Sequence, residues 1–183
     1  MNRKKILKLL AGLTIVLSSS TIINLKGVLV MADDTHSENV DWKFNNSDDG
    51  WKYWGEYDYT GSKEVSYDKL TNALELNLDY RNNALSSWSE FKISKALDSP
   101  IKFDGYNILT YDFIYNPQNM TTGSFKSKLF INGAADSYSD INLENSEDAG
   151  NGLKKAKVTI KFDSKSVNID SIIISIIGTN TYW

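Results

Sequence analysis

Most of this chain alternates apolar and polar residues with a period of two. In "LELNLDY" (74–80) the leucines fall on one parity and the polar residues on the other. "NILTYDFIY" (107–115), "FKSKLFIN" (125–132) and "KVTIKF" (157–162) repeat the pattern. Successive side chains of a strand point to opposite faces, so this alternation is typical of strands with one buried face. The run "IDSIIISII" (169–177) has isoleucine on both parities and predicts a strand buried on both faces.

Turn-forming residues separate these runs, and no segment after residue 40 keeps a helical period for three turns. The turn signals are Asp48-Asp49-Gly50, Gly61-Ser62, Arg81-Asn82-Asn83, Asp104-Gly105, Asn116-Pro117, Asn132-Gly133 and Gly150-Asn151-Gly152. Short strands between regular turns predict an all-β fold, an antiparallel β-sandwich of jelly-roll type with roughly nine strands.

The first 32 residues have the pattern of a secretory signal peptide. A basic "MNRKK" precedes an apolar stretch, and Val30 and Ala32 supply small residues for a cut after Ala32. Lys8 and Lys26 argue against the alternative, a membrane anchor. We expect a flexible polar leader over 33–40 and one domain over 41–183.

Removal of the leader leaves 151 residues with 15 Lys/Arg against 23 Asp/Glu, a net charge of about −8. Such an acidic chain is a poor partner for nucleic acid, and we expect no membrane association of the mature form. The absence of cysteine means that disulfides are not used. We therefore expect a secreted, extracellular protein, with a Gram-positive bacterium as the favoured source.

Few residues point to catalysis. The one histidine, His36, lies in the predicted flexible leader, and neither a cysteine nucleophile nor a phosphate-binding glycine loop is present. Paired carboxylates of a small glycanase stay an alternative. The candidates on predicted strands are Glu64, Glu75, Glu90 and Asp112.

Several turn acids have the oxygen ligands that calcium prefers, but none has EF-hand spacing. They are Asp41, Asp48, Asp49, Asp136 and Asp140. Solvated turn acids are the commoner explanation, and we assign no metal ligand and expect no required cofactor.

Aromatic residues are the strongest functional signal. Trp42 and Phe44 alternate in "VDWKF" as core residues of a first strand. Trp51 and Trp54, in "GWKYWGEYDYTG", stand among charged residues and glycines near a turn, so that core and surface are both open for them.

Trp88 shares a parity with Glu90 and Lys92, while Phe91 and Ile93 take the other. If the second set faces the core, Trp88 faces outward beside a carboxylate and an ammonium. An exposed indole stacks on the apolar face of a sugar ring, and flanking polar groups bond to the hydroxyls. An exposed aromatic patch with a polar rim generally marks a binding site.

The order of segments resembles family 27 carbohydrate-binding modules, the mannan-binding β-jelly-rolls of bacterial β-mannanases. The segments that carry the resemblance, over about 40–183, are "GWKYW", "LELNLDY", "SWSEFKI", "NILTYDFIYNP", "SFKSKLFING", "KKAKVTIKFD" and "IDSIIISIIGTNTYW".

Modules of this family bind mannooligosaccharides on three tryptophans. The resemblance places the first on Trp51 or Trp54, with the spacing in favour of Trp51, and the second on Trp88 with Glu90 beside it. The third falls in "NGAADSYSD", where this chain has Tyr138 instead of tryptophan. Related jelly-rolls often hold a structural calcium, which the resemblance leaves open here.

The resemblance implies a non-catalytic module that holds an attached mannanase on mannan, glucomannan or galactomannan. We expect a monomer tethered to a catalytic domain outside this sequence, and a module whose last strand lies beyond Trp183. A β-glucan or cellulose ligand, a small jelly-roll glycoside hydrolase and a surface adhesin are the alternatives.

Overall fold

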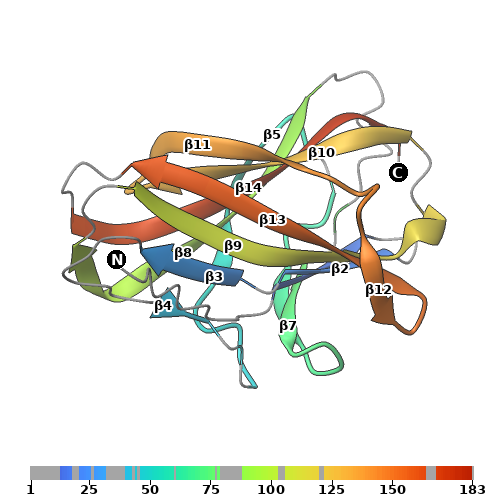
Figure 1. Ribbon diagram of the computed structural model, residues 1–183, viewed down its shortest axis with the longest axis horizontal. Coiled ribbons are helices and arrows are strands. Elements are labelled where there is room, and N and C mark those ends of the chain that lie inside the picture. Colours follow the sequence, from blue (N-terminus) through green and yellow to red (C-terminus); the bar gives the residue numbers. More distant parts are fainter. Residues whose placement is uncertain are drawn as a thin grey trace, which may run out of the picture.

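The computed structural model describes residues 13–17, 21–25, 27–31, 40–42, 44, 46–59, 61–76, 78, 88–102, 106–119, 122–163 and 168–182. These residues form three largely antiparallel sheets and one short 3-10 helix at Pro117–Asn119 (Figure 1). In the part of the chain that is described, no helix has the length and apolar character needed to span a membrane.

The first five-stranded sheet has the order β11-β10-β14-β8-β5. Its strands are β5 (Lys52–Tyr57), β8 (Ser89–Lys102), β10 (Thr122–Ile131), β11 (Ala134–Ile141) and β14 (Asn168–Tyr182). The central strand β14 carries the apolar run, and Ile172, Ile173, Ile174, Ile176 and Ile177 are all buried. The prediction of a strand covered on both faces is confirmed.

A second five-stranded sheet has the order β12-β13-β9-β3-β4. Its strands are β3 (Gly27–Met31), β4 (Val40–Asp41), β9 (Tyr106–Tyr115), β12 (Glu147–Gly150) and β13 (Leu153–Asp163). A four-stranded sheet of order β1-β2-β7-β6 adds β1 (Leu13–Leu17), β2 (Thr21–Leu25), β6 (Val65–Asp68) and β7 (Ala73–Leu76), with a parallel bridge between β1 and β7.

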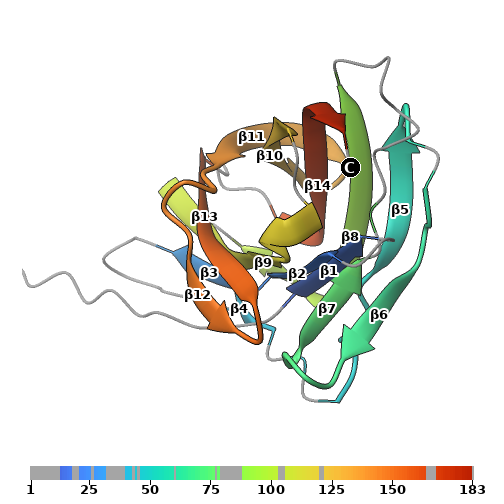
Figure 2. The ribbon, with the colours of Figure 1, turned by 90° about the vertical axis from the view of Figure 1, so that its right-hand side faces the viewer.

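The core lies between the two five-stranded sheets, which face each other in Figure 2. Phe113 of β9 contacts Phe125 of β10 with ring centroids 5.6 Å apart, so the two layers interlock across the interior. Alternate residues of β9 and β13 are buried as the period of two predicted. Trp42 and Phe44 also lie in the core, as expected. The all-β sandwich is therefore confirmed.

Turn chemistry sets the register of the strands. The Asn132-Gly133 turn joins β10 to β11 with φ of 49° and 80°, the positive values that a tight hairpin requires. The Asp48-Asp49-Gly50 turn also takes positive φ at its last two residues. The structure has more strands than the roughly nine predicted. Short hairpin strands such as β6 and β12 were missed because the prediction relied on long alternating runs.

Strands β1 to β3 fall within the predicted signal peptide. The prediction of cleavage concerns processing and is not tested by this fold. Residues 32–39, with His36, lie outside the described residues, and Val40 already belongs to β4 although we assigned it to the leader.

Candidate functional site

The first five-stranded sheet turns one face to the core and the other away from it. Phe91 and Ile93 of β8 are fully buried on the core side, so Glu90 and Lys92 point to the opposite side. Strand pairing places Ser175 of β14 and Lys128 of β10 in one row with Lys92. We call this side the outer sheet face. Its other members are Trp54, Tyr57, Trp88, Lys126, Phe130 and Tyr138.

Glu90 is the centre of a polar network on the outer sheet face. Trp88 Nε1 donates to Glu90 Oε1 at 2.8 Å, and Lys92 Nζ lies 3.0 Å from Glu90 Oε2. Ser175 Oγ donates to the same Oε2 at 3.2 Å. The predicted grouping of Trp88, Glu90 and Lys92 on one face agrees with these contacts.

The charge state of Glu90 follows from its neighbours. Burial alone raises the pKa of this carboxyl, but the hydrogen bonds from Trp88 and Lys92 and the charges of Lys92 and Lys128 outweigh it. The pKa of Glu90 is therefore below its ordinary value. The ionised carboxylate holds the Trp88 indole and the Lys92 ammonium in fixed positions.

Trp54 supplies an exposed ring beside this network. Its side chain is 50% exposed, and its ring centroid lies 6.4 Å from that of Phe130. Lys92 Nζ lies 5.9 Å from the Trp54 centroid and 5.6 Å from that of Phe130. A bulge between Tyr53 and Gly55 leaves Trp54 without a partner in β8, and bulges of this kind commonly re-aim a side chain.

Trp51, the other indole that the resemblance left open for the first platform ring, has the opposite environment. Its side chain is 3% exposed and meets Trp42 edge to face, with centroids 5.3 Å apart. Trp51 shares a parity with Tyr53, whose ring packs on Phe91 in the core. Trp51 therefore packs in the core beside Trp42, whereas Trp54 is exposed beside Phe130 on the outer sheet face.

Tyr57 and Tyr59 lie on different sides, although residues two positions apart on a regular strand share a face. Tyr57 is 61% exposed and pairs with Glu90 in the register of β5 and β8. Tyr59 is buried against Phe91 with centroids 5.5 Å apart. Between them Asp58 takes a φ of 45°, which ends the strand geometry and reverses the alternation.

Tyr138 extends the outer sheet face to the edge strand β11. It is exposed and pairs with Lys128 across β10 and β11. Lys126 Nζ lies 5.7 Å from its ring centroid and 3.4 Å from Asp140 Oδ1. Lys128 Nζ stands 4.9 Å from the Phe130 centroid. The predicted residues Trp54, Trp88, Glu90 and Tyr138 thus share one face.

The sequence did not identify Phe130 and Lys128 as parts of this face. Both follow Trp88 by about forty residues, and their proximity depends on the insertion of β14 between β8 and β10. The outward parity of Phe130, opposite Phe125 and Leu129, was the available signal.

The four carboxylates considered for a catalytic pair lie apart in the fold. Glu75, Glu90 and Asp112 belong to three different sheets, and exposed Glu64 precedes β6. Burial, with a contribution from the charge of Asp68, raises the pKa of Glu75. Asp112 Oδ2 lies 3.9 Å from Lys155 Nζ. These positions give the glycanase alternative no pair of facing acids.

The turn acids before β5 bond within their own turn. Asp49 Oδ2 accepts from Phe44 N at 3.0 Å and its Oδ1 from Ser47 Oγ at 2.8 Å, while Asp48 Oδ1 accepts from Gly50 N at 2.9 Å. No group of three or more acidic, His or Cys side chains able to hold a metal occurs within the described ranges. The structural calcium stays an untested expectation.

Comparison with solved structures gives a match to the carbohydrate-binding module TmCBM27, described in a study of specific mannan recognition. The TM-score is 0.52 at 16% identity, and the match covers 73% of this chain and 81% of that one. The predicted resemblance is therefore confirmed for the fold. The sequence matches no protein-family profile and no curated protein.

Proposed function

We propose that this protein is a non-catalytic module that binds polysaccharide on the outer sheet face. The observation that carries the proposal is the half-exposed Trp54 ring beside Phe130, on the same face as the Trp88–Glu90–Lys92 network. The fold shared with a carbohydrate-binding module supports it.

The arrangement fits the two kinds of contact that a sugar needs. The Trp54 indole offers an apolar surface to the face of a pyranose ring, and the adjacent lysines offer donors to its hydroxyls. Lys92 is held by Glu90 and lies near both aromatic rings. Because the face is preorganised, less entropy is lost on binding.

β-1,4-Mannan is the ligand that we propose first, because the structural neighbour is described as a mannan-recognising module. In this proposal the secreted protein holds an attached mannanase on polysaccharide and raises its local concentration by tethering. The proposed partners are mannan, glucomannan and galactomannan.

Affinity electrophoresis tests the proposal. The folded protein should be retarded in gels that contain glucomannan or galactomannan. Retardation by β-glucan or hydroxyethylcellulose alone would replace mannan by a glucan ligand. A folded protein that no polysaccharide retards would overturn the proposal, and release of reducing sugar from mannan would favour the hydrolase alternative.

A further inference from the structure

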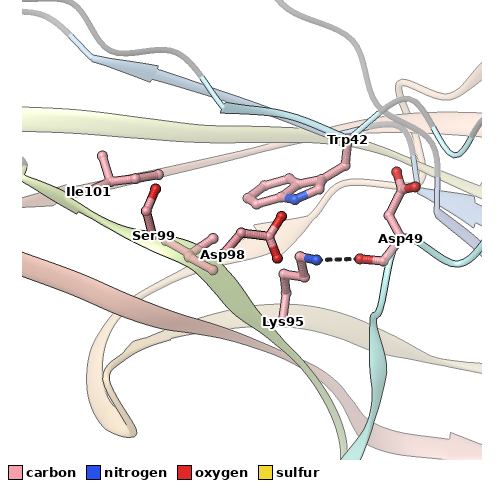
Figure 3. A pocket seen from close by; sticks show the side chains of 7 residues that line it. Trp42, Asp49, Lys95, Asp98, Ser99 and Ile101 are labelled. Atoms are coloured by element: carbon pink, nitrogen blue, oxygen red, sulfur yellow. Dashed lines mark hydrogen bonds between the residues drawn. The ribbon is translucent and has the colours of Figure 1, made fainter.

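A pocket of about 470 Å³ opens at a place separate from the outer sheet face. Its walls come from Trp42 before β5 and from the stretch of β8 around Lys95 to Ile101 (Figure 3). Lys95 shares the inward parity of Phe91 and Ile93, so this pocket belongs to the opposite side of β8. Ligand pockets typically measure roughly 300–1,000 Å³.

A wide bulge in β8 forms the pocket. Ala96 pairs with Ser171 of β14 and Ile101 pairs with Ile169, so the four residues 97–100 face a single residue of the partner strand. Pro100, which cannot donate to a ladder, lies within this bulge. Bulges occur preferentially at sheet edges and beside functional sites, where they re-aim side chains.

The polar groups of the pocket are available to a ligand. Lys95 Nζ donates to the backbone carbonyl of Asp49 at 2.5 Å and forms no salt bridge with a described residue. An ammonium has three donors, so two of them stay free for a ligand. In Figure 3 the Asp98 carboxylate lies between the Lys95 ammonium and Trp42, with Ser99 beyond it.

An ammonium and a carboxylate that line the same pocket can recognise hydroxyl groups, because a hydroxyl both accepts and donates a hydrogen bond. A simple anion would gain from Lys95 but meet repulsion from Asp98 and Asp49. The apolar part of the wall comes from Trp42, Leu97 and Ile101. A neutral sugar has both the vicinal hydroxyls and the apolar ring face that this lining matches.

We propose that this pocket is a second saccharide site, which takes one or two sugar units of a neutral glycan among Trp42, Lys95 and Asp98. The class of ligand rests on the proposed function, whereas the pocket is independent of the outer sheet face. Two sites on one module would strengthen its attachment to a polysaccharide through multivalency.

NMR titration of the full chain with mannohexaose, and separately with cellohexaose, tests the inference. We expect saturable shifts of the Gly50, Lys95 and Ser99 amides in addition to shifts around Trp54 and Lys92. Trp54→Ala should abolish the shifts on the outer sheet face and leave those of the pocket. Asp98→Asn should lower the affinity measured from the pocket shifts at least tenfold. Asp170→Asn, an exposed control, should leave the shifts at both places unchanged.

The outcomes separate the two proposals. Shifts confined to the outer sheet face would overturn the pocket and leave the proposed function standing. Shifts confined to the pocket, insensitive to Trp54→Ala, would overturn the proposed face and support the pocket. No shift with either sugar overturns the pocket inference, and no retardation in polysaccharide gels overturns the proposed function. Lys95→Met serves as a second variant, checked for folding because Lys95 also holds the 48–50 turn.

Discussion

Trp88 donates a hydrogen bond from its indole Nε1 to Oε1 of Glu90 over 2.8 Å, while Lys92 approaches the other carboxylate oxygen. The carboxylate therefore accepts from both neighbours at once. A carboxamide of the same shape has one acceptor oxygen and one donor nitrogen. One of the two contacts must then be lost.

For Glu90→Gln we expect weaker glycan binding, by roughly tenfold, and an unfolding free energy lower by about 1–3 kcal/mol, because a partly buried donor loses its partner. Chemical denaturation and affinity electrophoresis measure the two effects. Exposed Glu144→Gln is the matched control and should change neither. Unaltered stability and binding in Glu90→Gln would show that the network is dispensable.

The pH dependence of stability should distinguish Glu90 from Glu75. The folded pKa of Glu90 is lowered from 4.5, so its contribution is complete above that value and is lost as the pH falls through the folded pKa. The folded pKa of Glu75 is raised, chiefly by burial, so its ionisation costs stability at neutral pH and protonation relieves the cost.

Glu75→Gln should consequently stabilise the fold at neutral pH, with a gain that disappears as the pH falls below the ordinary value of 4.5. Glu90→Gln should lose stability at neutral pH, with a loss that shrinks in acid. Denaturation curves between about pH 3 and pH 8 provide the comparison. Parallel pH profiles for both variants and the parent would contradict the assignment of opposite shifts.

The two neighbouring tryptophans should respond oppositely to truncation. Trp51→Ala removes a ring from the core and should cost about 3–5 kcal/mol of unfolding free energy. Trp54→Ala removes a half-exposed ring and should cost about 1 kcal/mol. Thermal and chemical denaturation measure both. Equal costs would mean that the burial of one of the rings differs from the 3% and 50% exposures found.

Processing of the chain is the fourth test. Secretion should yield a mature protein that begins at Asp33, as intact mass and N-terminal sequencing would show. Loss of β3 removes the strand that pairs with β9 on one side, so β9 amides should exchange faster in the mature protein than in the unprocessed chain. A secreted chain that keeps residues 1–32 would contradict the predicted cut.

Local periodicity was enough to predict the strands and their buried faces, because alternation depends on the chain itself. It did not predict which strands are neighbours. Phe130 lies near Trp54 because β5, β8, β14 and β10 are neighbours in that order in the sheet. No local sequence pattern contains this strand order. The resemblance to a known family gave the sandwich but left Trp51 and Trp54 both open for the first ring, and only their burial in the fold distinguishes them.

Backbone irregularities account for other features that strict alternation does not predict. The positive φ of Asp58 places Tyr57 and Tyr59 on different sides. The four-residue bulge of β8 creates a pocket that the alternation pattern does not predict. Both depend on departures from regular strand geometry, where a rule of strict alternation fails.

Retardation of Trp54→Ala and of Trp51→Phe in glucomannan gels tests the central claim most directly, because the two residues lie three positions apart and on opposite sides of the strand. We predict that Trp54→Ala loses at least tenfold in affinity, about 1.4 kcal/mol, while folded Trp51→Phe binds like the parent. Parental binding by Trp54→Ala, together with a loss in folded Trp51→Phe, would contradict the outer sheet face as the site.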